Sequence, residues 1–341
     1  IAIGKASAAM LVGLSRALGD GLVTGIGVAK HASLDVPGNV DMHIGAHPVP
    51  DERSLYSGRA VVEFAASIPC GALVFCLISG GGSALVEALK PDVELADLRR
   101  VTSHLLRHGA SIHELNAVRS RMSTLKGGGL LHLLRHTTVI NLVVSDVLGD
   151  DLNVIASGPT VPSIAILRAE DVVERFRVKV TLPQPELIGS ETIGAPQCVI
   201  VANLDTAIDA AADEAETLGY ATSVVARSLE GEACEVAARF ASKAVEVGAH
   251  SSSGRPICLL AGGETTVTVA GNGVGGRNTE AALAAAIRLS GAAGVAIGFL
   301  ATDGDDGMTG AAGAIIDGAT VPVELVHGAS QALRDNDRLV G

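Results

Sequence analysis

The chain has 341 residues, enough for two domains of ordinary size, and a formal net charge of −12. This charge and an aromatic content of 2% argue against a nucleic-acid partner, which would need cations and rings for base stacking. The five cysteines form no C-x-x-C pair, which argues against a zinc site, and no apolar run approaches the ~18 residues of a membrane span. We therefore expect a cytoplasmic protein without a membrane partner, and leave open whether it is a monomer or a homodimer.

The chain opens with a short apolar strand that leads into Gly4-Lys5-Ala6 and a helix from residue 6 to 18. In open α/β sheets ligands bind at the carboxyl ends of the strands, so Lys5 is expected at a ligand-binding edge. A solvated turn lysine is the alternative. The chain contains no Walker motif, G-x-x-x-x-G-K-[ST]. Residues 46–54 hold two prolines and read as a rigid linker, in which Asp51 or Ser54 caps a helix over 55–67.

A glycine loop, Ser79-Gly80-Gly81-Gly82-Ser83, follows the apolar strand predicted over 72–78. Its backbone amides and two hydroxyl groups would suit a phosphate. Three consecutive glycines cost backbone entropy, which favours a functional loop over a structural one. A short helix is predicted over 84–89, and a longer amphipathic one over 97–108.

Cations gather in the next segment, although the chain has few of them. Arg119, Arg121 and Lys126 lie close in sequence, and Lys126 precedes a second glycine triplet. In an acidic protein this clustering predicts an anion pocket. A solvated helix face is the alternative, and we prefer it for Arg121.

Acidic residues follow two predicted strands. The strand over 139–144 leads into Asp146, Asp150 and Asp151, and the strand over 295–301 leads into Asp303, Asp305 and Asp306. Carboxylates at such strand ends are suited to a divalent metal or to a substrate hydroxyl.

Four prolines between residues 161 and 196 surround one helix, over 169–176, and indicate the crossing to a second domain. The strand over 198–202, helix over 206–218, strand over 221–226 and helix over 234–247 then alternate as in a parallel sheet. We expect domains at 1–190 and 191–341.

The stretch 259–280 is predicted to contain strands over 259–261 and 265–270, a glycine loop and the start of a helix over 280–287. Arg277 stands at the join, where its guanidinium would fork onto a phosphate or carboxylate. A glycine-rich hairpin with a surface arginine is the alternative. Gly271, Gly273 and Gly276 also match the dinucleotide pattern G-x-G-x-x-G, but the acidic residue expected about 20 positions later is missing.

Both halves thus supply glycine loops, cations and acidic strand ends. We expect an α/β protein made of two Rossmann-like domains with mainly parallel sheets and an active-site cleft between them. Phosphoryl transfer fits this set of residues, because it depends on positioning and charge neutralisation. No G-x-S-x-G elbow for acyl transfer is present.

Several of these motifs together resemble the type II glycerate kinases, the glycerate 2-kinases that carry a MOFRL domain. The resemblance rests on the segments 4–6, 47–52, 79–85, 116–119, 126–128, 145–151, 155–160, 262–264, 275–278 and 301–307. It implies ATP- and Mg²⁺-dependent phosphorylation of D-glycerate at its 2-hydroxyl, giving 2-phosphoglycerate and ADP. The alternatives are an NAD(P)H-dependent hydroxypyruvate reductase, a label that some relatives carry, and a non-catalytic nucleotide- or sugar-acid-binding module.

The chain departs from the family pattern at Ala46, Gly129 and Thr279, where glycine, arginine and glutamine are usual. The family also has helical residues before the first strand and a tail after the second domain, so we expect the chain to lack both.

The resemblance also implies roles for individual residues. Lys5 and Arg277 would be catalytic, neutralising the transferring phosphoryl group. The acceptor would contact Asn116, Arg119 and Asp150, with Lys126 as a second candidate for its carboxylate. Asp146, Asp303 and Asp306 would hold Mg²⁺ or orient the hydroxyl. Phosphate or nucleotide binding is expected at Ser79, Gly80, Gly81, Gly82, Ser83, Lys126, Gly127, Glu264, Gly275, Gly276 and Asn278.

Overall fold

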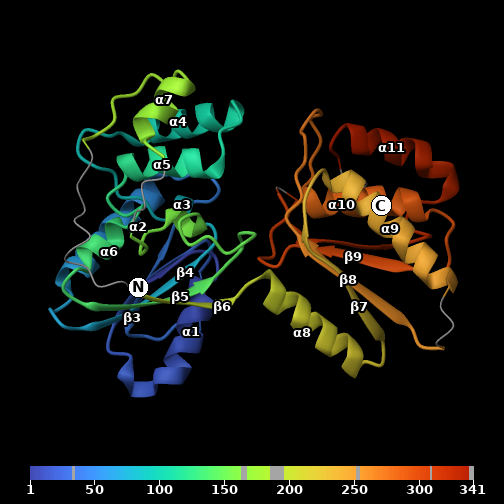
Figure 1. Ribbon diagram of the computed structural model, residues 1–341, viewed down its shortest axis with the longest axis horizontal. Helices are drawn as coiled ribbons and strands as arrows, with labels where there is room; N and C mark the ends of the chain where they lie inside the picture. The colour runs from blue at the N-terminus through green and yellow to red at the C-terminus, as the bar shows by residue number, and fades with distance from the viewer. Residues whose placement is uncertain (33–34, 163–166, 185–195, 251–253, 308, 338–341) are drawn as a thin grey trace. The chain divides into compact units, whose positions relative to one another are not determined.

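The computed structural model describes residues 1–32, 35–162, 167–184, 196–250, 254–307 and 309–337. The chain forms two compact units, Ile1–Asn203 and Leu204–Gly341, each described by itself (Figure 1). The domain boundary expected at residue 190 lies outside the described residues.

A parallel sheet forms the centre of the first unit. Its described strands are β1 (Ala2–Ile3), β2 (Gly25–Ala29), β3 (Val40–Ile44), β4 (Leu73–Ser79), β5 (Thr138–Val144) and β6 (Gln197–Ala202). Their order is β3-β2-β1-β4-β5-β6, and every pairing is parallel. This is the order of the Rossmann fold, in which the direction of winding reverses between the first and fourth strands. The chain therefore has a topological switch point between the carboxyl ends of β1 and β4.

Strand β6 was expected to open a second sheet, and that prediction is wrong. Leu142 of β5 pairs with Val199 of β6, so β6 is the edge strand of the first sheet. The Asn203 side-chain amide donates to Asp150 Oδ2 at 2.7 Å and ties the end of β6 to the loop after β5. Alternation of strands and helices shows that a strand exists, but not which open edge it joins.

The described helices of the first unit cover its sheet and build a further layer (Figure 1). They are α1 (Ser7–Leu18), α2 (Glu52–Ser67), α3 (Gly82–Leu85), α4 (Leu95–Arg107), α5 (Ile112–Met122), α6 (Gly129–Leu133) and α7 (Ala169–Arg175), with short 3-10 segments η1 (Gly19–Gly21) and η2 (Ile155–Ser157). α2 begins at Glu52, three residues before the predicted start at 55, and the predicted cap at Asp51 is confirmed: Asp51 accepts from the Arg53 N–H, and Ser54 Oγ accepts from the Asp51 N–H.

The helix predicted over 84–89 ends early, at Leu85. Beyond it the chain pairs with its neighbours, because the Glu87 N–H donates to Ser54 O and the Lys90 N–H donates to Met122 O, each at 3.0 Å. A separate apolar core then joins α4, α5 and α7, with Leu98, Val118 and Val172 among its buried members.

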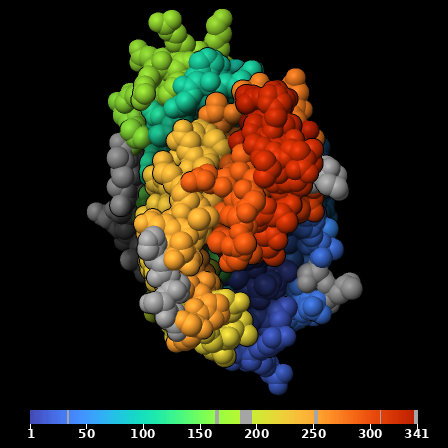
Figure 2. Space-filling view, turned by 90° about the vertical axis from the view of Figure 1, so that its right-hand side faces the viewer, coloured from blue at the N-terminus to red at the C-terminus, as the bar shows by residue number. Residues whose placement is uncertain are grey.

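The second unit contains α8 (Leu204–Thr217), β7 (Ala221–Leu229), α9 (Ala233–His250), β8 (Ile257–Gly263), α10 (Arg277–Leu289), β9 (Ala296–Leu300), β10 (Gly313–Asp317), η3 (Val323–Leu325) and α11 (Val326–Arg334). β7 and β8 pair in parallel, whereas β9 and β10 form an antiparallel pair. α9 and α10 pack through small side chains, including Ala237, Ala241 and Ala285, which are fully buried. Figure 2 shows this unit from its helical side, with α9 in light orange and α11 in red.

The predicted α/β class with mainly parallel sheets is confirmed. The strand predicted over 265–270 is wrong, because only Thr266 forms a single bridge there, to Glu232. Hydrogen bonds to side chains replace the ladder: the Thr268 N–H donates to the Glu232 carboxylate, and the Ala270 N–H donates to Asn336 Oδ1. None of the described helices combines the length and apolar character needed to cross a bilayer.

Candidate active site

Lys5 lies at the switch point of the first sheet, in a turn held firmly against the end of β4. The Lys5 N–H donates to Gly80 O at 2.9 Å, and the Ala6 N–H donates to Ser79 Oγ at 3.1 Å. Gly4 has φ +127°, and a Cβ there would overlap Ser79. The turn therefore fixes where the Lys5 side chain starts, at the sheet edge where the topology predicts a ligand.

The glycine loop is needed because other segments come very close to it. A Cβ on Gly80 would overlap the Asp146 carboxylate, and one on Gly82 would lie 2.7 Å from Ala156 Cβ. A Cβ on Gly81 would lie 3.0 Å from Lys5 Cγ and 3.2 Å from His47 Cδ2. The structure therefore brings together Lys5, the loop and Asp146, as well as His47, for which no role was predicted.

Ser79 and Ser83 differ in their surroundings. Ser79 is only 1% exposed and its hydroxyl accepts the Ala6 N–H, so this side chain holds the turn that carries Lys5. Ser83 Oγ lies 2.6 Å from Ser157 Oγ, and Ser157 Oγ donates to Asn116 Oδ1 at 2.8 Å. This chain of polar groups links the glycine loop to η2 and α5.

The η2 segment is strained. Ala156 and Ser157 have φ values of +52° and +62°, and Gly158 follows at +58°. Left-handed non-glycine residues are costly and tend to be found at functional sites. The Gly127 N–H donates to Ser157 O at 2.9 Å, so the backbone amide of this predicted phosphate binder has a partner within the fold.

The two cations predicted to meet the acceptor have different environments. Lys126 is 4% exposed, and its ammonium pairs with the fully buried carboxylate of Glu87. Arg119 is only partly buried and shares a face of α5 with Asn116, three residues earlier. Burial lowers the pKa of both cations, and the nearby Glu87 charge raises it in part.

Sequence reasoning missed Glu87. The available signal was a single acid in the apolar run Ala84-Leu85-Val86-Glu87-Ala88-Leu89. A charge within such a run is expected to be buried with a partner. Its partner, Lys126, is distant in sequence and can be recognised only in the fold.

Two of the acids after β5 were predicted site residues, and of these Asp146 is exposed and lies against the glycine loop. Asp150 is half-buried, has φ +55° and accepts the hydrogen bond from Asn203. Asp146 is therefore the acid of this pair that lies beside Lys5 at the switch point.

In the second unit, Arg277 is the first residue of α10. Its Nη1 donates to Glu264 Oε1 at 2.7 Å, and each of the two side chains is 50% exposed. The structure thus joins two of the predicted site residues, at the end of β8 and the start of α10. An exposed ion pair of this kind contributes little to stability. The Arg277 guanidinium could therefore leave Glu264 and bind a ligand with little loss of free energy.

Asp306 caps α10. Its Oδ1 accepts the Asn278 N–H and its Oδ2 accepts the Thr279 N–H, both at 2.8 Å, and the residue is 3% exposed. Gly276 is required here, since a Cβ would lie 2.5 Å from Asp306 Cγ. A carboxylate therefore fills the helix N-terminus where a phosphate was expected. This geometry favours a capping role for Asp306, whereas Asp303 is exposed and accepts the Asp305 N–H at 3.0 Å.

The G-x-G-x-x-G match has a structural explanation. The glycine segment runs against the chain after α11: the Gly273 N–H donates to Asp335 O at 2.9 Å, and a Cβ on Gly271 would overlap Asp335. A Cβ on Gly275 would lie 2.9 Å from Asn336 O. Within the described residues β8 ends at Gly263, so no strand leads directly into the motif. The dinucleotide context is therefore missing.

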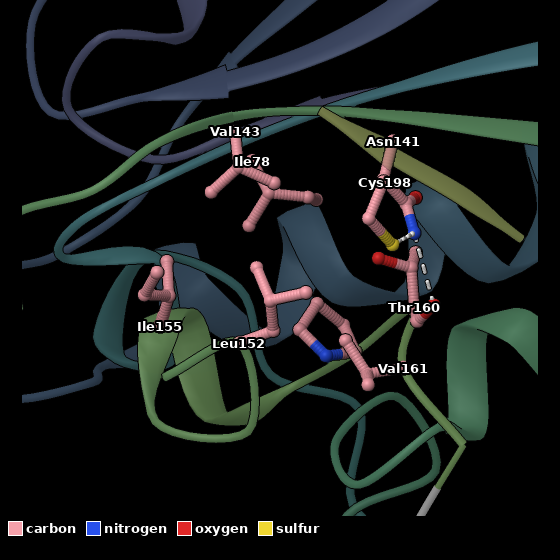
Figure 3. Close-up of a pocket in the computed structure, with 9 residues that line it drawn as sticks. Ile78, Asn141, Val143, Leu152, Ile155, Thr160, Val161 and Cys198 are labelled. Carbon is pink, nitrogen blue, oxygen red and sulfur yellow. Dashed lines mark hydrogen bonds between the residues drawn. The ribbon is translucent and has the colours of Figure 1, made fainter. Parts of the chain in front are cut away.

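Two cavities of the first unit lie apart from this site. One, of about 10 Å³, is lined by side chains that include Asn141 and Cys198, and Asn141 Nδ2 donates to Thr160 O at 3.1 Å (Figure 3). A space of this size holds about one water molecule. The other, of about 500 Å³, is lined by Asp92, Val93, Asp97, Arg100, Met122, Lys179, Val180 and Thr181. Neither contains a residue of the candidate site.

The sheet order and the polar groups at its switch point define a Rossmann-like α/β protein. Residues 1–186 match the family described as a domain of unknown function, DUF4147, and residues 257–339 match the MOFRL family. The chain is 37% identical to a D-glycerate 2-kinase of Thermotoga maritima, over 99% of this chain and 83% of that protein. A crystal structure of a glycerate kinase from the same organism superposes with a TM-score of 0.81 at 34% identity, covering 98% of this chain and 83% of that one.

A protein of Agrobacterium vitis with the provisional name hydroxypyruvate reductase is also 37% identical, over 93% of this chain and 85% of its own length. The chain belongs to the MOFRL-type glycerate kinase family. The family expected from the motifs is thereby confirmed.

Proposed function

We propose that the protein transfers the γ-phosphoryl group of ATP to the 2-hydroxyl of D-glycerate, giving 2-phosphoglycerate and ADP. The observation that carries this proposal is the position of Lys5 beside the glycine loop at the switch point. Membership of a family with named glycerate kinases supports the substrate and the phosphoryl donor.

Lys5 and Arg277 would neutralise the charge that develops on the transferring phosphoryl group, because phosphoryl transfer depends mostly on positioned charge. Backbone amides of the Gly80–Gly82 loop would donate to phosphate oxygens.

For the carboxylate of glycerate, we favour Arg119 over Lys126. The Lys126 ammonium is buried and paired with Glu87, whereas Arg119 is partly exposed. Asn116 supports the choice, since its Nδ2 is a buried donor without a partner among the described residues. A buried donor of this kind is costly unless a ligand satisfies it. Arg119 and Asn116 would thus fix the acceptor by its carboxylate.

Mg²⁺ would be held with ATP. Among the described residues, no three His, Cys, Asp or Glu side chains are grouped closely enough to form a metal site. Mg²⁺ in kinases takes most of its ligands from phosphates and water, with one or two carboxylates, so the residues present fit a nucleotide-bound ion. Asp146, exposed beside the glycine loop, is the carboxylate that we propose for it, with Asp303 as a second candidate. The ion would neutralise phosphate charge.

We expect kinase activity and no reductase activity. Incubation with D-glycerate, ATP and Mg²⁺ should yield ADP and 2-phosphoglycerate, identified by phosphorus NMR. The control replaces these substrates with hydroxypyruvate and NADH, because the motif that suggested a nicotinamide cofactor is taken up by packing against residues 335–337. NADH oxidation without ADP formation would contradict the proposal. Formation of 3-phosphoglycerate would contradict only the choice of hydroxyl.

We expect Asp146→Asn to affect Mg²⁺ binding and Asp306→Asn to affect stability. Asp146→Asn should weaken the apparent Mg²⁺ affinity in turnover assays. Asp306→Asn should lower stability by about 1 kcal/mol, because one oxygen that accepts a helix N–H becomes an amide donor. Its apparent Mg²⁺ affinity should stay near that of the wild type. If only Asp306→Asn weakens the apparent Mg²⁺ affinity, Asp306 and not Asp146 is the metal ligand.

A further inference from the structure

Three charged side chains of the first unit, Glu87, Arg119 and Lys126, influence one another. Glu87 is 0% exposed and Lys126 is 4% exposed, and these two form a buried ion pair. Arg119 lies near enough for its charge to act on Lys126 and for that of Glu87 to act on Arg119. Lys126 is paired with Glu87, and Arg119 adds a second positive charge nearby, so these three groups together carry a net charge of +1.

The position of Glu87 is set by the backbone. Its N–H donates to Ser54 O at 3.0 Å, and Gly58 of α2 packs so closely against Glu87 O that a Cβ at Gly58 would overlap it. Two contacts with α2 thus hold the backbone of Glu87 in place. Its Oε1 has no hydrogen-bond partner among the described residues, so it keeps the capacity to accept from Arg119.

A buried carboxylate between two cations can neutralise either of them. While Lys126 is paired with Glu87, the positive charge of Arg119 remains available to a ligand. Without Lys126, the Glu87 carboxylate would pair with Arg119 and neutralise its charge. A buried and otherwise unpartnered donor, Asn116 Nδ2, lies on the same face of α5 as Arg119. A bound anion would compensate the net positive charge of the three groups and would accept a hydrogen bond from Asn116 Nδ2.

We propose that Glu87 and Lys126 form a positioning pair that sets the net charge of this pocket to +1, so that it accepts one carboxylate. The inference rests on the proposed function, in which that carboxylate belongs to glycerate. Neither member of the pair touches the substrate. Lys126 acts by holding Glu87 away from Arg119, and the pocket is matched to a monoanionic hydroxy acid.

The test compares Lys126→Met with the double variant Glu87→Gln/Lys126→Met. We expect Lys126→Met to weaken D-glycerate binding at least about tenfold, because Glu87 then neutralises Arg119. The double variant removes both charges of the pair and leaves +1 in the pocket. Its dissociation constant for glycerate should return to within about threefold of the wild type, although it still lacks Lys126. Replacing a buried ion pair by uncharged side chains is often tolerated by the fold.

Calorimetric titration of each protein with D-glycerate in the absence of ATP gives these constants, and circular dichroism checks folding. If the double variant binds as poorly as Lys126→Met, then Lys126 contacts the anion itself and the proposal is wrong. Wild-type affinity in Lys126→Met also overturns it. Should Lys126→Met fail to fold, the double variant decides alone, since a loss of more than about tenfold there refutes the positioning role.

Turnover separates this inference from the proposed function. A wild-type protein that binds glycerate and forms no ADP contradicts the kinase activity while leaving the charge argument open to the binding data. In an active enzyme, we expect Lys126→Met to raise KM for glycerate with a much smaller change in kcat, because a carboxylate anchor acts equally on ground and transition states. A fall in kcat alone contradicts the anchor.

Discussion

Alanine at Lys5 or at Arg277 is expected to lower turnover by about two orders of magnitude or more, as removal of other preorganised charge donors does. Negative charge in phosphoryl transfer is spread over the attacking, leaving and equatorial oxygens, so these cations should act mainly in the transition state. Nucleotide affinity should change less, because the backbone of the glycine loop remains. The measurements are kcat and KM for ATP and glycerate in each variant.

Arg277→Lys should rescue poorly, because an ammonium group cannot reproduce the two-pronged guanidinium. Arg16→Ala, at the exposed end of α1, is the matched control for loss of a cation, and should behave as the wild type. If both alanine variants keep near-normal kcat and only raise KM for ATP, Lys5 and Arg277 dock the nucleotide and do not stabilise the transition state.

Gly58→Ala is expected to lower the free energy of unfolding by about 1–3 kcal/mol, the usual range for overpacking. Helix propensity alone predicts the opposite sign, since alanine in place of a helical glycine gains up to about 1 kcal/mol. The reversal follows from the close approach of α2 to Glu87, whose carbonyl oxygen a Cβ at Gly58 would overlap.

Gly13→Ala in α1 supplies the control, because a Cβ there has nothing within 4 Å. It should stabilise the protein by the propensity term. Urea unfolding followed by circular dichroism measures both variants; the chain has no tryptophan for fluorescence. Equal gains in the two variants would show that α2 does not press against Glu87 in solution.

Most of the fold could be predicted from local pattern. The apolar runs at β4 and β5 and the capped start of α2 are strong signals, and the structure has these elements nearly where they were expected. β2 and β3 were missed because one contains Gly25 and Gly27 and the other contains Asp41 and His43, which dilute the strand pattern. The sheet that β6 joins depends on an open edge far away in sequence.

The sequence could predict the site residues that follow a strand, because ligands bind at the carboxyl ends of parallel strands. It could not predict residues whose role depends on a contact with a residue far away in sequence. Lys5 and the glycine loop each follow a strand, as expected, and the strand order places them together at the switch point. Glu87 and Ser157 became visible only through contacts with Lys126 and Asn116. Which acid of a glycine-rich strand end caps a helix, as Asp306 does, also depends on tertiary packing.

The Asp306 carboxylate at the start of α10 affects what the G-x-G-x-x-G motif of this chain can bind. The Asp306 carboxylate already accepts two backbone N–H groups at this helix start. A pyrophosphate could bind there only by displacing this buried side chain and breaking both hydrogen bonds. In this chain, the G-x-G-x-x-G match therefore lies beside a helix start that its own aspartate already caps. Asp306 comes from the segment after β9, so a carboxylate of this chain occupies the place that a pyrophosphate takes in a dinucleotide-binding fold.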